Sequence, residues 1–104
     1  MRREEALAGM RSRLERAFGS RLKGVVLYGS HARGTADERS DFDLLVVLQE
    51  PVHLGADLET IVRAVYPVQL RLEAPIHALP VSASAFELAE YALYREAKRD
   101  GTYL

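Results

Sequence analysis

The sequence contains no cysteine, and its charges almost cancel. Without cysteine the chain can form no disulfide, no thiolate zinc site and no cysteine nucleophile, a composition that fits a reducing compartment. The 14 Lys and Arg residues oppose 15 Asp and Glu residues, so the formal net charge is −1. Because no global basic field would draw the chain onto nucleic acid, we do not expect a nucleic-acid polymerase.

Long apolar runs are also missing. No stretch approaches the roughly 18–20 apolar residues of a membrane span, and the N-terminus alternates charged and apolar residues instead of forming a signal-peptide core. We therefore expect a cytoplasmic protein with no membrane association. The 104 residues, 48% hydrophobic and 28% charged, predict a single globular domain over residues 1–104.

One local charge asymmetry interrupts the overall balance. Residues 1–23 hold seven basic and three acidic side chains. Two interpretations are open for this segment. It is either a solvated helix face, as such charge runs usually are, or a contact surface for phosphates, RNA or an acidic partner.

Hydrophobic periodicity predicts the first half of the fold. Apolar residues recur at three- and four-residue spacing over 3–18, which predicts an amphipathic helix. Two short apolar segments, 25–28 and 41–48, predict strands, and residues 31–40 between them predict a turn or a short helix. The second strand is almost wholly apolar after its opening carboxylates, so we expect helices on both faces of the sheet.

The second half is less regular. A helix is predicted from about Ala56, and Pro67 should end or kink it. Residues 68–73 then either alternate as a strand or resume the helix. Residues 76–81 predict a third strand that is short or lies at a sheet edge, because prolines precede and interrupt it.

A last helix has the clearest boundary signals. Ser84 and Glu87 have the spacing of a capping box, and Gly101 suits a left-handed C-cap. The element order is then α-β-turn-β-α-β-α, which predicts one layered α/β (or α+β) fold.

Two carboxylates open the second predicted strand. Residues i and i+2 of a strand point to the same face, so Asp41 and Asp43 aim the same way. Like charges held this close need compensation by a proton, an arginine or a hard cation. Magnesium with oxygen ligands, completed by a substrate phosphate, is the natural choice.

A Gly-Ser pair ends the preceding strand. Gly29 permits close backbone approach, while the Ser30 hydroxyl and the free N–H groups of a following helical turn can bind phosphate. A phosphate cradle beside a paired-carboxylate metal site suits phosphoryl or nucleotidyl transfer.

Together these residues give the pattern Gly-Ser-x10-Asp-x-Asp, with Ala32-Arg33-Gly34 and Ser40 inside it. The pattern resembles the minimal nucleotidyltransferases of the DNA polymerase β superfamily. The resemblance is strong over about residues 24–48, and it implies a polymerase-β-like core with a small mixed sheet. Such enzymes transfer a nucleoside monophosphate, usually AMP from ATP, to an acceptor hydroxyl with the help of magnesium.

The resemblance also implies roles for individual residues. Asp41 and Asp43 would ligate magnesium, and Gly29 and Ser30 would hold the triphosphate. Arg33 would contact phosphate or, alternatively, form a surface ion pair with one of two nearby carboxylates, Asp37 or Glu38.

The family pattern calls for a third carboxylate on a later strand, as metal ligand or as base. The predicted third strand has no Asp; its one polar side chain is His77, and Glu73 lies just before it. We predict that Glu73 supplies the third catalytic and metal-binding group. The alternatives are His77 or no third group, in which case the acceptor hydroxyl is not activated.

The acceptor is inferred from the same resemblance. Short members of the family resemble antitoxins that adenylylate a tyrosine on a HEPN-domain toxin, and a partner or second copy would complete the site of so short a chain. The alternative is a non-catalytic module that neutralises its partner by binding it. A third possibility, a plain α/β domain, requires the ten-residue spacing to be chance.

Overall fold

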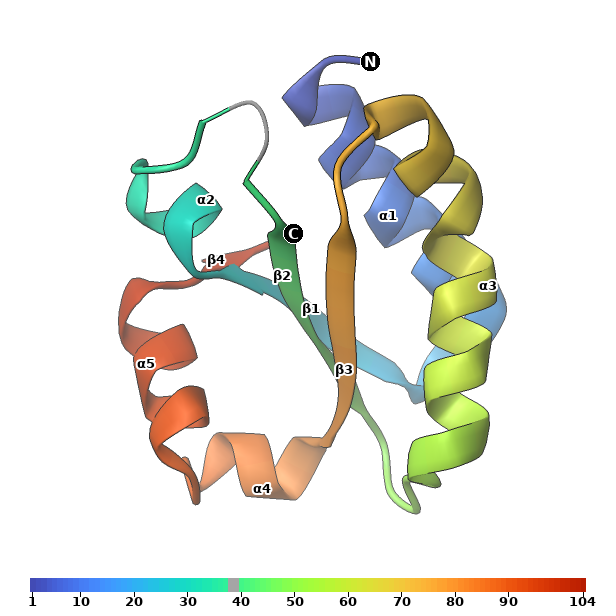
Figure 1. Ribbon diagram of the computed structural model, residues 1–104. Coiled ribbons are helices and arrows are strands. Elements are labelled where there is room, and N and C mark those ends of the chain that lie inside the picture. The colour runs from blue at the N-terminus through green and yellow to red at the C-terminus, as the bar shows by residue number, and fades with distance from the viewer. Residues whose placement is uncertain (38–39) are drawn as a thin grey trace.

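The structure, a computed structural model, describes residues 1–37 and 40–104. A four-stranded mixed sheet carries helices on both faces (Figure 1), which confirms the predicted α/β class. The elements, in chain order, are α1 (Arg3–Phe18), the 3-10 turn η1 (Gly19–Arg21), β1 (Leu22–Tyr28), α2 (Ser30–Arg33), β2 (Phe42–Leu48), α3 (Leu54–Leu72), β3 (Ile76–Ser82), α4 (Ala83–Glu87), α5 (Ala92–Asp100) and β4 (Thr102–Tyr103).

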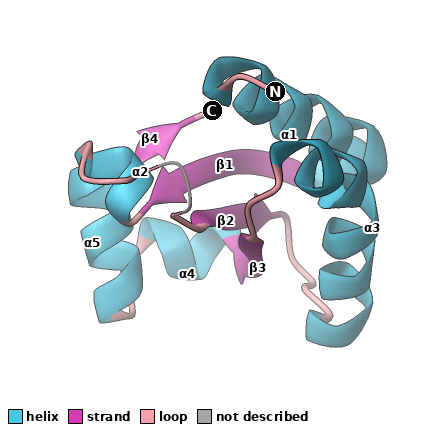
Figure 2. Cartoon of the chain, turned by 45° about the horizontal axis from the view of Figure 1, so that its top comes forward, coloured by secondary structure: helices cyan, strands magenta, loops and turns pink. Residues whose placement is uncertain are grey.

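The strand directions determine where the sheet gathers its loop residues. The strand order is β3-β2-β1-β4 (Figures 1 and 2). β1 pairs antiparallel with β2 and β4, whereas β2 and β3 are parallel. A parallel pair needs a crossover, and α3 provides it. The C-terminal end of β1 therefore meets the N-terminal ends of β2 and β3 at one end of the sheet.

Helices cover both faces of the sheet (Figure 2). Along β2, Phe42, Leu44 and Val46 belong to the core cluster that includes α1 and α3. Leu45 and Val47 belong to a second cluster that includes α4 and α5. The strand is thus buried on both faces, as its unbroken apolar run predicts.

The helix predicted to end or kink at Pro67 continues through it. α3 extends over 19 residues, and the strand alternative for residues 68–73 is wrong. Proline lacks the N–H of the helical hydrogen bond, but Val65 and Val68 on either side of it are buried. Packing of this helix face against the core offsets the lost hydrogen bond.

The predicted last helix is split into α4 and α5. α4 ends at Glu87, and Ala89 has a φ of 52° in the turn before α5. The N-cap of α4 is Ser82, whose hydroxyl accepts a first-turn N–H, so the predicted capping box is wrong. Ser84 instead donates both its N–H and its hydroxyl to the carboxylate of Glu50.

Gly101 allows the chain to pack closely against α5 and β1, and it does not form a left-handed C-cap. Its φ is −78°, so the predicted left-handed conformation is wrong. A Cβ at this position would collide with the carbonyl of Ala97 and would lie 2.7 Å from Cγ1 of Val26. The missing side chain lets the chain turn from α5 into β4, a strand that the sequence patterns do not predict.

The edge strand β3 offers few hydrogen-bond donors to another strand. The side-chain oxygen of Gln69 accepts the N–H of Ile76 at 3.1 Å, and Pro80 has no N–H to donate. Proline and side-chain cover are usual ways to protect a sheet edge. The edge position of β3 confirms the prediction from its prolines.

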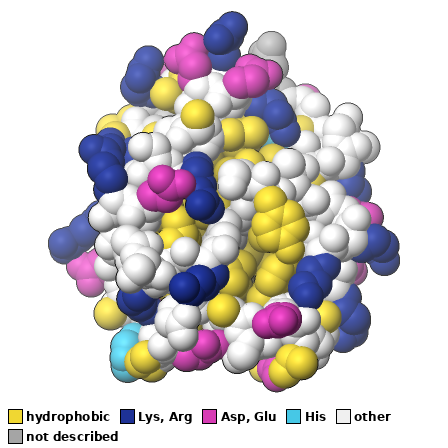
Figure 3. Space-filling view, turned by 180° about the vertical axis from the view of Figure 1, so that it is seen from behind, with side chains coloured by type: hydrophobic (Ala, Val, Ile, Leu, Met, Phe, Trp, Pro, Cys, Tyr) yellow, Lys and Arg dark blue, Asp and Glu magenta, His cyan; other side chains and the backbone are white. Residues whose placement is uncertain are grey.

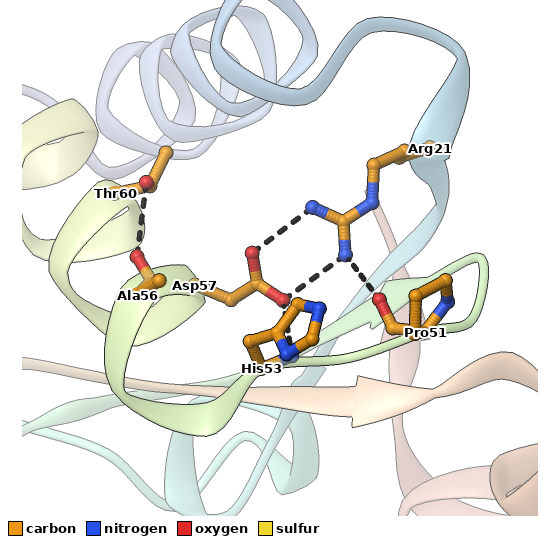
Figure 4. A network of polar contacts seen from close by, with 6 residues as sticks. All are labelled: Arg21, Pro51, His53, Ala56, Asp57 and Thr60. Carbon is orange, nitrogen blue, oxygen red and sulfur yellow. Dashed lines mark hydrogen bonds and ion pairs between the residues drawn. The ribbon is translucent and has the colours of Figure 1, made fainter.

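Arg21, which directly precedes β1, binds the first turn of α3 and the loop before it (Figure 4). Its guanidinium donates to both carboxylate oxygens of Asp57, at 2.9 and 3.0 Å, and to the carbonyl of Pro51 at 2.9 Å. The N–H of His53 donates to the same carboxylate. Asp57 is 5% exposed, and its hydrogen bonds from Arg21 lower its pKa.

The surface carries charges of both signs. Figure 3 shows basic and acidic side chains interspersed over the face seen from behind. Within the basic segment 1–23, Arg11 pairs with Glu15, and Arg21 pairs with Asp57. The Arg11–Glu15 pair on α1 fits the interpretation of the segment as a solvated helix face, whereas Arg21 binds the buried Asp57. In the described part of the chain, no helix is long and apolar enough to cross a membrane.

Candidate active site

Four predicted site residues meet at the end of the sheet where β1 finishes and β2 begins. Gly29 and Ser30 follow β1, Asp41 precedes β2, and Asp43 is the second residue of β2. Tyr28, the last residue of β1, lies opposite Asp43 in the antiparallel register. The pairing therefore places the Gly-Ser turn beside the Asp-x-Asp carboxylates.

Gly29 is in close contact with the Asp43 carboxylate. Its φ is 75°, in the left-handed region, and a Cβ at this position would lie 2.6 Å from Oδ2 of Asp43. The left-handed backbone conformation favours glycine here, and any larger residue would force the Asp43 carboxylate to shift. The close approach expected of this glycine is thus made by a carboxylate of the neighbouring strand.

A single helical turn, α2, follows Gly29. The N–H groups of Ala32 and Arg33 donate to the carbonyl of Gly29, and Gly34 ends the turn with a φ of 74°. Ser30 is the first residue of the turn and is partly buried. The first N–H groups of a helical turn have no acceptor within it, which makes this position suitable for an anion.

The two carboxylates differ in their surroundings. Asp41 is exposed, whereas Asp43 is partly buried. Burial raises the pKa of Asp43, and the nearby Asp41 carboxylate raises it further, while the charges of His77, His31 and Arg33 act in the opposite direction. The site therefore concentrates negative charge that a cation would stabilise.

His77 lies directly beside this pair. In the parallel register of β2 and β3 it is opposite Asp43, and its Nε2 is 2.9 Å from Oδ2 of Asp41. Since a carboxylate oxygen accepts, Nε2 is the donor in this contact. On β3, the side chain that contacts the Asp-x-Asp pair is therefore the imidazole of His77.

Glu73 is placed differently from the other predicted residues. It is the C-cap of α3, with a φ of 59°, and its side chain is exposed. It lines a cavity of about 1000 Å³ together with Arg3, His31, Phe42 and Leu72. The cavity borders the α1 and α3 side of the sheet, where Phe42 packs, whereas Asp43 alternates to the other side.

Arg33 lies at the end of α2 and is exposed. Burial raises the pKa of the Asp43 carboxyl, and the charge of Arg33 acts against this rise, so Arg33 is within electrostatic reach of the site. Of the two alternative ion-pair partners, Glu38 lies outside the described residues, and Asp37 contacts Ser40.

Two further residues shape the site without a signal in the sequence pattern. His31 stacks on Phe42, with ring centroids 3.7 Å apart, and its Nε2 donates to the carbonyl of Ser40 at 3.1 Å. Tyr28 is partly buried, and burial together with the Asp43 charge raises its pKa. The stacking of His31 depends on the tertiary contact between α2 and the start of β2, which no local sequence pattern contains.

The donor set suits a hard cation. Asp41 and Asp43 offer carboxylate oxygens, which Mg²⁺ prefers, and the backbone of Gly29 leaves Asp43 packed tightly at the site. Within residues 1–37 and 40–104, no three His, Asp or Glu side chains are grouped so that they could hold a metal ion. The described residues thus contribute two carboxylates to the site.

Comparison with known proteins places these residues in a family. The chain matches the nucleotidyltransferase domain family over residues 7–94. Two proteins of Methanocaldococcus jannaschii, both named "Putative protein adenylyltransferase", are similar to parts of it. One is 38% identical over 47 residues, which are 45% of this chain and 47% of that protein. The other is 60% identical over 30 residues, which are 29% of this chain and 20% of that protein.

The matches to these two relatives cover less than half of either relative's own length. The family match is broader, since residues 7–94 include the Gly-Ser turn, both carboxylates of β2 and all of β3. This chain belongs to the nucleotidyltransferase domain family of the DNA polymerase β superfamily.

Proposed function

We propose that this chain transfers a nucleoside monophosphate, AMP from ATP, to an acceptor hydroxyl. The observation that carries the proposal is the contact of the Asp43 carboxylate with the backbone of Gly29. This contact joins the phosphate-binding turn to the paired carboxylates at one end of the sheet. The names of the two relatives support adenylyl transfer.

Each site residue has a role in this proposal. Asp41 and Asp43 hold Mg²⁺, which when bound neutralises charge on the reacting phosphate. Gly29 and Ser30 bind the triphosphate through the start of α2. Arg33, whose charge reaches Asp43, adds a contact to a phosphate oxygen.

The proposed reaction is an in-line displacement at the α-phosphorus of ATP. The acceptor oxygen forms a bond to this phosphorus as the bond to the bridging oxygen of the β-phosphate breaks. Pyrophosphate leaves with that electron pair, and the hydroxyl proton passes to a base or to water. The products are adenylylated acceptor and pyrophosphate.

The base is Glu73 or His77, or water alone. Glu73 follows from the family pattern, whereas His77 lies beside Asp41 in the structure. Glu73→Gln and His77→Gln separate these possibilities, because each variant removes one base and keeps a polar side chain of similar length. Loss of transfer in only the first variant assigns the base to Glu73.

We propose a protein as the acceptor, with a tyrosine of a HEPN-domain toxin as the specific target. Both relatives are named as protein adenylyltransferases, which supports a protein acceptor. The toxin is proposed as the partner because the sequence resembles short, antitoxin-like members of the family.

A second candidate function is neutralisation of that partner by binding alone. The observation that favours it is the histidine opposite Asp43, where the family pattern calls for a carboxylate. A chain with a weakened metal site could keep the fold and still occupy its partner.

One experiment separates the two functions. The protein is incubated with Mg²⁺, ATP labelled at the α-phosphate, and a HEPN-domain toxin as the proposed partner. Label on the partner that is abolished by Asp43→Asn and kept by Glu59→Gln supports transfer, because Glu59 is a surface carboxylate on α3 paired with Arg63. Neutralisation without label, unchanged in Asp43→Asn, supports binding alone and contradicts the enzyme proposal.

A further inference from the structure

His77 occupies the position where a third metal ligand would act. It is in register with Asp43 on the adjacent strand. Side chains of residues in register on neighbouring strands project to the same face, with strands about 4.8 Å apart. A carboxylate at position 77 would therefore join the Asp-x-Asp pair.

The histidine binds Asp41 instead of completing a ligand set. Its Nε2 donates to one oxygen of Asp41, Oδ2, at 2.9 Å, and so restrains the carboxylate through that oxygen. Both side chains remain open to solvent, with 60% of His77 and 47% of Asp41 exposed. An outer hydrogen bond of this kind orients a metal-binding group without itself binding the metal.

The number of carboxylates that the protein supplies then limits its affinity for a cation. Mg²⁺ takes six oxygen ligands, several of them usually waters, and is commonly held by one or two carboxylates together with substrate phosphates, whereas imidazole suits softer metals. Among the described residues, the protein offers two carboxylates and no third His, Asp or Glu in a metal-binding group.

We infer that His77 is a positioning residue for Asp41, and that a histidine at this place leaves the site binding a divalent cation only weakly until a nucleoside triphosphate supplies phosphate oxygens. This inference rests on the proposed function, because it deepens the role of the same site. The cation and the triphosphate bind as a unit, and each raises the affinity for the other by the same factor.

Mn²⁺, whose free ion gives a spectroscopic signal that binding removes, is the probe that tests this inference. We expect wild type and His77→Gln to bind Mn²⁺ weakly without nucleotide. His77→Asp should bind it at least about tenfold more tightly, because it adds a third carboxylate. His77→Glu repeats this test with a longer side chain if His77→Asp does not fold, and a rise in melting temperature on adding Mn²⁺ confirms that the folded state binds the ion.

The positioning of Asp41 by His77 is tested separately, by the affinity for Mn²⁺ in the presence of a nucleotide. With α,β-methylene-ATP present, His77→Ala should lower the affinity of the protein for Mn²⁺ by about tenfold. His77→Gln should restore it, because the glutamine amide can donate to Asp41 in place of Nε2. Equal loss in both variants contradicts positioning through this hydrogen bond.

The failures of the inference and of the proposed function are distinguishable. If wild type binds Mn²⁺ without nucleotide as tightly as His77→Asp while α,β-methylene-ATP still binds, the inference is overturned and the proposed function stands. If α,β-methylene-ATP binds neither in the presence nor in the absence of Mn²⁺, both the proposed function and the inference are contradicted.

Discussion

The carboxylate of Asp43 lies against the backbone of Gly29, so close that a Cβ on residue 29 would be 2.6 Å from Oδ2. The two residues come from adjacent antiparallel strands, one just after β1 and the other near the start of β2. The contact fixes the position of the carboxylate relative to the turn that begins α2. Geometry of this kind is useful for catalysis because the reacting groups need little rearrangement.

Replacing Gly29 by alanine tests this contact. The new Cβ would meet Asp43, and the φ of 75° is unfavourable for alanine. We expect Gly29→Ala to lower the free energy of unfolding by about 1–3 kcal/mol, and to reduce adenylyl transfer by displacing Asp43. Urea denaturation and the label-transfer assay measure the two effects.

Gly55→Ala is the matched control. Gly55 lies in the first turn of α3, without a positive φ, and a Cβ there would meet no atom within 4 Å. Alanine should therefore stabilise the helix by up to about 0.5–1 kcal/mol. A loss of stability in this variant as large as in Gly29→Ala would contradict the explanation from the Asp43 contact.

Asp43→Asn should separate stability from activity. Burial raises the pKa of Asp43, so its charged form is unfavourable in the folded state without a cation. A carboxyl group whose pKa is raised in the folded state destabilises the fold at pH values above that pKa. This cost disappears as the pH falls below the pKa of the same group in the unfolded chain. We expect Asp43→Asn to melt at a higher temperature than wild type at pH 7, and at a similar temperature at pH 3.

The same variant should lose adenylyl transfer by at least about a hundredfold, because charge stabilisation at the reacting phosphate is lost. Melting curves without added metal and the label-transfer assay give the two measurements. A variant less stable than wild type at pH 7 would show that the Asp43 charge is already compensated in the free protein.

The parts of the site that the sequence predicts are those set by local rules. Asp41 and Asp43 share a face because of the two-residue period of a strand, and Gly29 and Ser30 lie next to them because consecutive strands tend to pair. The place of His77 depends on the register between β2 and β3. That register is set by the 19-residue helix between them and by its packing, which no local pattern contains.

The wrong predictions about the helices have the same cause, because each depends on contacts that no local pattern contains. The capping box at Ser84 fits the local pattern, but the carboxylate that binds Ser84 comes from Glu50, 34 residues earlier in the chain. Continuation of α3 through Pro67 depends on the burial of its neighbours, which exceeds the effect of the local helix breaker.

Glu50 should make stability depend on pH in the acid range. Hydrogen bonds from Ser82 and Ser84 lower the pKa of Glu50 from 4.5 to about 2. A lowered pKa means that the carboxylate stabilises the fold above pH 4.5, and that this contribution is lost as the pH falls towards 2. The difference in unfolding free energy between wild type and Glu50→Ala should therefore shrink between these pH values, as urea denaturation at a series of pH values will measure. A difference that stays constant over this range would contradict the role of the charge.

Asp57 should matter for stability and not for the chemistry. Its buried carboxylate accepts two hydrogen bonds from Arg21 and one from the backbone of His53, at the end of α3 remote from the Asp-x-Asp pair. Asp57→Ala removes these three hydrogen bonds and leaves the contact of Arg21 with the carbonyl of Pro51. We expect a loss of about 2 kcal/mol in the free energy of unfolding. Glu59→Gln breaks an exposed ion pair two residues further along α3, and should change stability by less than about 0.5 kcal/mol. At a temperature where both variants are folded, the rate of adenylyl transfer should equal that of wild type. A slower rate in Asp57→Ala alone would show that the loop between β2 and α3 is coupled to the site.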